Sequence, residues 1–143
     1  MPVYLLDTDV LTLLAQGHAE VCRRVAAAQP GEVRTTAINV EEQLTGWYSF
    51  LRTTKRPDQI EWAYAELIRT TLFLASLPLV NYTVQAITRY DSLLRQKLNV
   101  RKNDLRIAAI ALEVGAIVVT RNVRDFGRVP SLTIKDWSQP AAP

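Results

Sequence analysis

Short apolar runs of strand length alternate along this chain with longer stretches that have helical spacing. Such runs at residues 3–6, 33–38, 77–80 and 116–119 predict strands, and residues 132–134 are a candidate edge strand. Strands that alternate with helices form parallel sheets through right-handed crossovers, and helices then cover both faces. The pattern therefore predicts a three-layer α/β/α sandwich with a central, mainly parallel sheet of four to five strands.

The stretches between the strands predict helices at residues 10–15, 19–29, 40 to beyond 47, 58–73 and 83–97, and a buried helix that begins at Asn103 or Asp104. Asn39 is the predicted N-cap of the third helix, because its side chain can accept a hydrogen bond from a free backbone N–H. The helix at residues 83–97 is amphipathic, with Val84, Ile87, Tyr90 and Leu94 on one face.

The length of 143 residues suits one domain, which we place at residues 1–137, followed by a tail at 138–143 that we expect to be frayed. No apolar run reaches the roughly 18 residues that a membrane span needs, and the first residues lack the basic stretch of a secretory signal. Because the single cysteine, Cys22, excludes an internal disulfide, we expect a cytoplasmic protein. A net charge of +3 suits a polyanionic partner without requiring one.

The residue types that are scarce in this chain exclude several classes of site. The five glycines form neither a dinucleotide-binding G-x-G-x-x-G pattern nor a Walker loop. The only histidine, His18, excludes metal sites that need several imidazoles, and no serine lies in a G-x-S-x-G pattern. If the chain is an enzyme, its working groups are therefore expected to be carboxylates.

Acidic and amide side chains follow the predicted strands at the points where each strand ends. Asp7 and Asp9 follow the first strand, and Glu41 and Glu42 open the helix after the second. Asp104 begins the buried helix, and Asn122 and Asp125 follow the strand at residues 116–119. In open parallel sheets the functional crevice lies at the carboxyl ends of the strands, so these side chains are the candidate site. For Asp9, an N-cap role is favoured over a place in the site.

Several carboxylates in one crevice repel one another and raise each other's pKa unless a cation neutralises them. A site built from oxygen ligands alone selects a hard cation such as Mg²⁺ or Mn²⁺. Such an ion favours attack by water on a phosphoryl group. The acids of this chain therefore predict metal-dependent hydrolysis of phosphodiester bonds.

Four segments of the chain, in order, resemble the motifs of the PIN-domain family. These are LDTDVL at residues 6–11, INVEEQLTG at 38–46, NDLRIAA at 103–109 and VVTRNVRDF at 118–126. They resemble a strand ending in aspartate, a glutamate four residues before a glycine, an aspartate leading into an Ile-Ala-Ala helix, and a Thr-x-Asn/Asp segment ending in Asp-Phe. The match covers nearly the whole chain, and within the family the chain resembles the VapC toxins of bacterial and archaeal toxin–antitoxin pairs.

This resemblance implies an endoribonuclease in which Asp7, Glu42 and Asp104 hold Mg²⁺ or Mn²⁺. The fourth position has Asn122 where many PIN domains have aspartate, so either Asn122 or Asp125 completes the catalytic group. The resemblance also implies an RNA substrate, a cognate antitoxin whose tail covers the crevice, and a homodimer. Thr8, Thr120, Arg106 and Arg121 are candidate supporting residues, because hydroxyls can orient carboxylates and basic residues can hold a phosphate backbone against an acidic site.

Other readings of the same residues stay open. The chain could be a housekeeping PIN nuclease without an antitoxin, or an RNA-binding PIN domain that no longer cuts. Asp7 and Asp9 after an apolar strand also resemble the first motif of aspartyl phosphatases, but Leu11 stands where that motif has threonine. The aromatic residues of the helical hairpin, Trp47, Tyr48, Phe50, Trp62 and Tyr64, are predicted to be core residues rather than RNA-stacking groups, although a partner could dock there.

Overall fold

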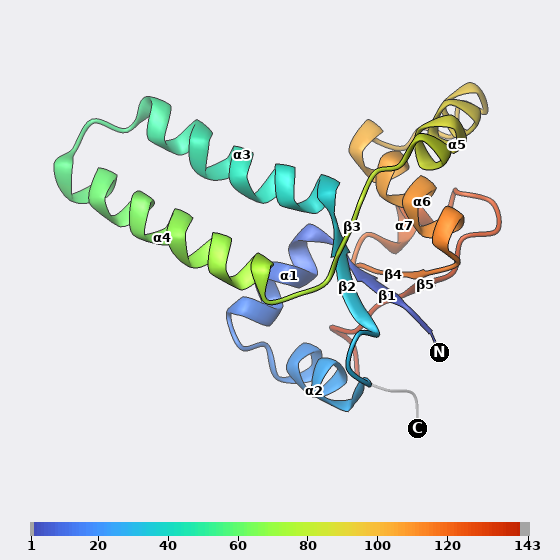
Figure 1. Ribbon diagram of the computed structural model, residues 1–143, viewed down its shortest axis with the longest axis horizontal. Coiled ribbons are helices and arrows are strands. Elements are labelled where there is room, and N and C mark those ends of the chain that lie inside the picture. The colour runs from blue at the N-terminus through green and yellow to red at the C-terminus, as the bar shows by residue number, and fades with distance from the viewer. Residues whose placement is uncertain (1, 141–143) are drawn as a thin grey trace.

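The computed structural model describes residues 2–140, in which a five-stranded sheet lies between two layers of helices (Figure 1). The strands are β1 (Tyr4–Leu6), β2 (Val33–Thr36), β3 (Leu79–Val80), β4 (Ile117–Val119) and β5 (Ile134–Lys135). They are all parallel, in the order β3-β2-β1-β4-β5. The predicted sandwich is confirmed, and the candidate edge strand at 132–134 is β5, at residues 134–135.

In the described part of the chain, seven helices connect these strands: α1 (Thr8–Ala15), α2 (Ala19–Ala27), α3 (Ala37–Thr53), α4 (Pro57–Ala75), α5 (Val84–Arg95), α6 (Lys102–Val114) and α7 (Val123–Phe126). The one-turn helix α7 was not among the predicted elements, because four residues are too few to show helical spacing. Within residues 2–140, no helix is both long and apolar enough to cross a membrane.

Alternate residues of the central strands face two separate cores. Leu5 of β1 and Val118 of β4 pack into the core under α5, α6 and α7. Their neighbours Leu6 and Val119 pack into the other core, which α1, α2 and α4 cover. Side chains of a strand point alternately to opposite faces, so every residue of these buried strands is apolar.

The helices α3 and α4 form an antiparallel hairpin that extends beyond the sheet on one side of the molecule (Figure 1). Because the hairpin projects, its aromatic residues are only partly covered: Tyr48, Trp62 and Tyr64 are 49%, 50% and 54% exposed. The rings of Trp47, Phe50 and Trp62 pack edge to face, with centroids 5.5 to 6.5 Å apart. The prediction that these aromatic residues lie in the core is therefore wrong for the three exposed ones, and Trp47 and Phe50 are half-buried, outside both cores.

Three helix ends differ from those predicted. Thr36, rather than Asn39, caps α3, and Asn39 completes a capping box as the third helical residue. Asp7, rather than Asp9, caps α1 by accepting a hydrogen bond from the Thr8 backbone N–H. The helix α6 begins at Lys102, one residue before the earlier of its two predicted starts. In each case the helix begins earlier than expected, and for α3 the cause is that β2 ends at Thr36, two residues before its predicted end.

The buried face of α5 also differs from the apolar face that its sequence shows. Ala86, Tyr90 and Leu93 are buried, whereas Val84, Ile87 and Leu94 are 74%, 40% and 42% exposed. The three buried residues pack with α6 in one core. Apolar side chains are consequently left on the outer surface of α5. Residues 141–143 of the predicted tail lie outside the described residues.

Candidate functional site

Four of the predicted acids, Asp7, Asp9, Glu42 and Asp104, meet in one pocket at the carboxyl ends of β1 and β4, which are neighbouring strands of the sheet. The pocket is lined by residues from four segments: Asp7, Thr8, Asp9, Thr12, Glu42, Arg101, Asp104 and Asn122. The strands β1 and β4 are paired in register through Leu6 and Val119, so the residues that follow them, Asp7 and Thr120, lie side by side. The topology of the sheet thus gathers side chains that are about 100 residues apart in sequence.

Asp7 is the most constrained of these acids. It is 8% exposed, and its two carboxylate oxygens accept hydrogen bonds from the Thr8 backbone N–H at 2.8 Å and the Thr120 hydroxyl at 3.0 Å. Burial raises the pKa of Asp7 from 3.8 to about 6, and the nearby charges of Asp104 and Asp9 act in the same direction. The protein therefore buries a carboxyl group whose charge its own surroundings only partly stabilise.

The side-chain amide of Asn39 holds Asp7 and Thr8 in place. Asn39 is fully buried, and sequence reasoning assigned it only to a helix cap. Its Nδ2 donates to Asp7 Oδ1 at 3.3 Å and to the Thr8 hydroxyl oxygen at 3.1 Å. Its Oδ1 accepts from the Thr36 hydroxyl at 2.7 Å. The spacing of Thr36 and Asn39, three residues apart after a strand, is the signal that could have identified a capping box here.

Glu42 reaches the same pocket from the first turns of α3. Its Oε1 accepts a hydrogen bond from the Thr8 hydroxyl at 3.2 Å, and its side chain is 20% exposed. Burial raises the pKa of Glu42, the negative charge of Asp104 adds to this, and the Thr8 hydrogen bond and Arg101 oppose it. Glu41, its neighbour, is exposed and lines a separate, adjacent cavity instead. The structure thus places Glu42, and not Glu41, in the lining.

Asp104 enters the pocket from the first turn of α6 and is 2% exposed. It accepts hydrogen bonds from Arg101 and from Asn122 Nδ2, the latter at 3.3 Å. Asn122 also donates to Asp125 at 3.1 Å, and Asp125 in turn pairs with Arg128 at 3.1 Å. Of the two candidates for the fourth position, Asn122 lines the pocket, and Asp125 lies behind it in contact with Asn122.

The remaining predicted residues divide between the pocket and its surroundings. Asp9 lines the pocket and pairs with Arg121 at 2.9 Å, while its other oxygen, Oδ1, is buried without a hydrogen-bond partner among the described residues. Thr8 and Thr120 orient Glu42 and Asp7 through their hydroxyls. Arg106 donates to Asn103 at 2.7 Å and lies over the Tyr90 ring, outside the pocket lining.

The chemistry of these side chains fits a divalent cation. Four carboxylates and one amide supply only oxygen ligands, one of the oxygens is unpartnered, and two of the carboxyl groups have raised pKa values. As the side chains stand in residues 2–140, no three acidic, histidine or cysteine residues are grouped as a metal-binding set. Binding therefore requires some carboxylates to exchange their present hydrogen bonds for the metal.

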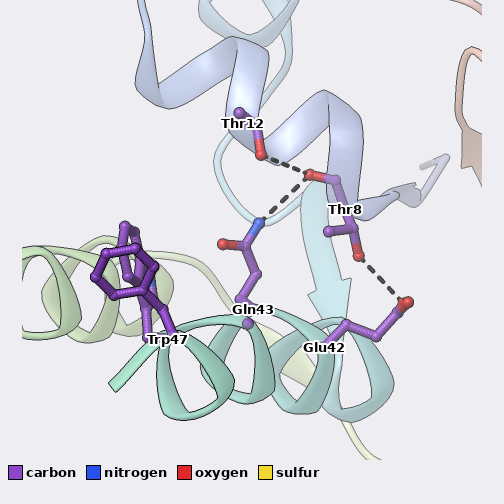
Figure 2. A pocket seen from close by; sticks show the side chains of 7 residues that line it. Thr8, Thr12, Glu42, Gln43 and Trp47 are labelled. Carbon is purple, nitrogen blue, oxygen red and sulfur yellow. Dashed lines mark hydrogen bonds between the residues drawn. The ribbon is translucent and has the colours of Figure 1, made fainter. Parts of the chain in front are cut away.

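A groove continues from this pocket between α1 and α3 (Figure 2). Thr8, Thr12 and Glu42 line both cavities, and Gly46, Trp47 and Phe50 extend the groove along the hairpin. Gln43 and Thr12 both donate hydrogen bonds to the Thr8 backbone oxygen, at 3.4 and 3.2 Å, as Figure 2 shows. The acidic pocket thus continues into a groove that is lined in part by the aromatic side chains of Trp47 and Phe50.

Comparisons with known proteins agree with one another. The model of the PIN domain matches residues 4–132. Ribonuclease VapC2 of Rickettsia felis is 33% identical, over 96% of this chain and 99% of the relative. Ribonuclease VapC1 of Haemophilus influenzae (strain R2866) is 25% identical over the same shares of the two chains. The chain is thus similar to these ribonucleases over nearly its whole length.

Among solved structures, the DNA-bound VapBC of Salmonella typhimurium has a TM-score of 0.75 at 24% identity, covering 96% of this chain and 99% of that chain. VapBC-1 of nontypeable Haemophilus influenzae has a TM-score of 0.74, also at 24% identity and with the same coverage. At this level of identity the likeness shows a shared fold.

Proposed function

The chain belongs to the PIN-domain family, and on that premise we propose that it is a metal-dependent endoribonuclease, the toxin of a VapBC-type pair. One observation carries the catalytic part of the proposal. Asp7, Glu42 and Asp104 come from three distant segments, yet all of them line one pocket at the carboxyl edge of the sheet. Ribonuclease names among relatives that match nearly the full length support RNA as the substrate.

We assign Asp7, Glu42 and Asp104 as the residues that hold Mg²⁺ or Mn²⁺, with Asn122 as a further oxygen ligand or water-orienting group. When bound, such a cation stabilises the negative charge that develops on the phosphoryl group and lowers the pKa of a water. The hydroxyls of Thr8 and Thr120 hold Glu42 and Asp7 in place, and the Asn39 amide holds both Asp7 and Thr8. Asp125 acts indirectly, by orienting the Asn122 amide.

We propose that a cognate antitoxin covers the pocket and its groove. Two findings support this: structural neighbours are VapBC complexes, and the groove of Trp47 and Phe50 leads directly into the acidic pocket. We also propose that the protein forms a homodimer, which the exposed apolar side chains on α5 support. We propose that residues 1–137 form a single domain.

Metal removal tests the proposed activity. We expect purified protein to cut single-stranded RNA in the presence of Mg²⁺ or Mn²⁺, to lose this activity in excess EDTA, and to recover it when Mn²⁺ is returned. The measurement is the appearance of fragments from an end-labelled RNA. Cleavage that EDTA leaves unchanged would contradict the metal assignment. Binding of RNA without cleavage in Mn²⁺ would instead favour an RNA-binding PIN domain that does not cut.

A further inference from the structure

Arg101 is the only basic residue in the lining of the acidic pocket, as far as the described residues show. It immediately precedes α6, and its side chain is 71% exposed. Its guanidinium lies between two carboxylates from different helices: Nη2 is 3.4 Å from Asp104 Oδ1 and 3.9 Å from Glu42 Oε2, and Nε is 3.4 Å from Asp104 Oδ2. A positive charge of the protein itself thus faces two of the three acids that we assign to the metal.

The contacts of Arg101 are loose for charge-assisted hydrogen bonds. Such bonds between guanidinium and carboxylate groups usually measure about 2.7–2.9 Å, whereas those of Arg101 are 3.4 Å or longer. Because most of the side chain faces solvent, it can leave the pocket without opening the core. Its pKa is raised, chiefly by the hydrogen bond and charge of Asp104, so it carries its charge at every physiological pH.

A purely structural role in capping α6 does not account for this residue. Arg101 is the N-cap of α6 and makes no side-chain capping hydrogen bond. A cation at a helix N-terminus is also disfavoured by the helix dipole, which prefers negative charge there. What Arg101 does contact is the buried Asp104 carboxylate, which needs a positive partner when no metal is present.

We propose that Arg101 is an internal counter-cation, which neutralises Glu42 and Asp104 in the metal-free protein and competes with the divalent ion for them. This inference rests on the proposed function, because it takes Glu42 and Asp104 as metal ligands. It adds a form of regulation: the metal concentration at which the site fills is set by the guanidinium that must first be displaced. Removing the charge of Arg101 then has two opposite effects. It lowers the stability of the metal-free protein, and it raises the affinity for the divalent ion.

Calorimetric titration with Mn²⁺, beside thermal unfolding in EDTA, separates these effects in Arg101→Gln, Arg101→Lys and wild-type protein. We expect Arg101→Gln to bind Mn²⁺ about fivefold or more tightly, since a unit charge about 4 Å away acts on each ligand. We expect the same variant to unfold at a lower temperature in EDTA. Arg101→Lys keeps the charge and is expected to lie close to wild type in both measurements.

Arg124→Gln is the matched control, because it removes an exposed positive charge from α7 outside the pocket lining. If Arg101→Gln binds Mn²⁺ no more tightly than wild type, or if Arg124→Gln tightens binding as much, Arg101 is not a competitor and the inference is overturned. Absence of Mn²⁺ binding in wild type and every variant would overturn the metal assignment itself, and this inference with it.

Discussion

Replacement of Glu42 by glutamine is expected to reduce RNA cleavage by about a thousandfold, which corresponds to about 4 kcal/mol of transition-state stabilisation. Glutamine preserves the shape of the side chain and can still accept the hydrogen bond from the Thr8 hydroxyl. It removes the negative charge that the proposed metal requires. Since Glu42 is partly exposed rather than deep in the core, we expect the variant to fold as wild type does.

Glu41→Gln is the matched control for this prediction. The two glutamates are adjacent in α3 and lose the same charge on substitution, but Glu41 is exposed outside the acidic pocket lining. Initial rates on the same labelled RNA, with equal circular dichroism spectra for both variants, make the comparison. Similar losses in the two variants would contradict the assignment, because they would show that general charge near α3, not a ligand at residue 42, controls the rate.

Replacement of Asp7 by asparagine is expected to stabilise the metal-free protein above pH 6, by roughly 3 kcal/mol. The pKa of Asp7 is 3.8 in the unfolded reference and about 6 in the folded chain, so the folded state binds the proton more tightly. Wild-type protein therefore loses stability as the pH rises from about 4 through about 6, while Asp7 becomes a buried charge. The asparagine variant lacks this loss.

Urea unfolding in EDTA between pH 4 and pH 8 measures this effect as the difference between the two proteins. The other acids titrate in both proteins, so their contributions largely cancel in the difference. We expect the two stabilities to be similar near pH 4 and to diverge up to about pH 7, with the variant above wild type. Addition of Mn²⁺ at pH 7.5 should stabilise wild type only. Parallel pH profiles in EDTA would show that burial of Asp7 imposes no electrostatic penalty.

The positions of the strands and their parallel direction could be predicted because they depend on patterns that parallel sandwiches share, whereas the order β3-β2-β1-β4-β5 was not predicted. Apolar runs such as residues 116–119 have few alternatives to a buried strand once helices surround them. The strand ends also indicated the candidate acids, since parallel strands present their carboxyl ends on one edge of the sheet. Asp7, Glu42 and Asp104 were named on this basis and on family resemblance, and they do lie in one pocket.

The contacts inside the pocket could not be predicted, because each depends on an exact position in three dimensions. Asn39 was assigned a cap by its residue type, but the early end of β2 moves it into the buried first turn of α3, against Asp7. Asp9 was expected to cap α1, yet α1 begins two residues earlier and directs Asp9 toward Arg121. A shift of one or two residues at a helix start rotates a side chain by 100° or more, which local propensity does not resolve.

Exposure in the projecting hairpin shows a second limit of sequence patterns. Trp62 and Tyr64 have the composition of core residues, and nothing in their spacing says that α3 and α4 extend past the sheet. Tertiary shape decides whether an apolar face is covered, so the same pattern can mark a core or a surface for a partner.

Binding of Mn²⁺ to the purified, metal-stripped chain is the most direct test of the central claim, that Asp7, Glu42 and Asp104 form one divalent-cation site. Electron paramagnetic resonance reports free Mn²⁺, whose signal falls as the ion binds. We predict saturable loss of the signal in wild type and little or no loss in Asp104→Asn, whose side chain keeps its shape but not its charge. Equal binding by the two proteins, or no binding by wild type, would contradict the claim.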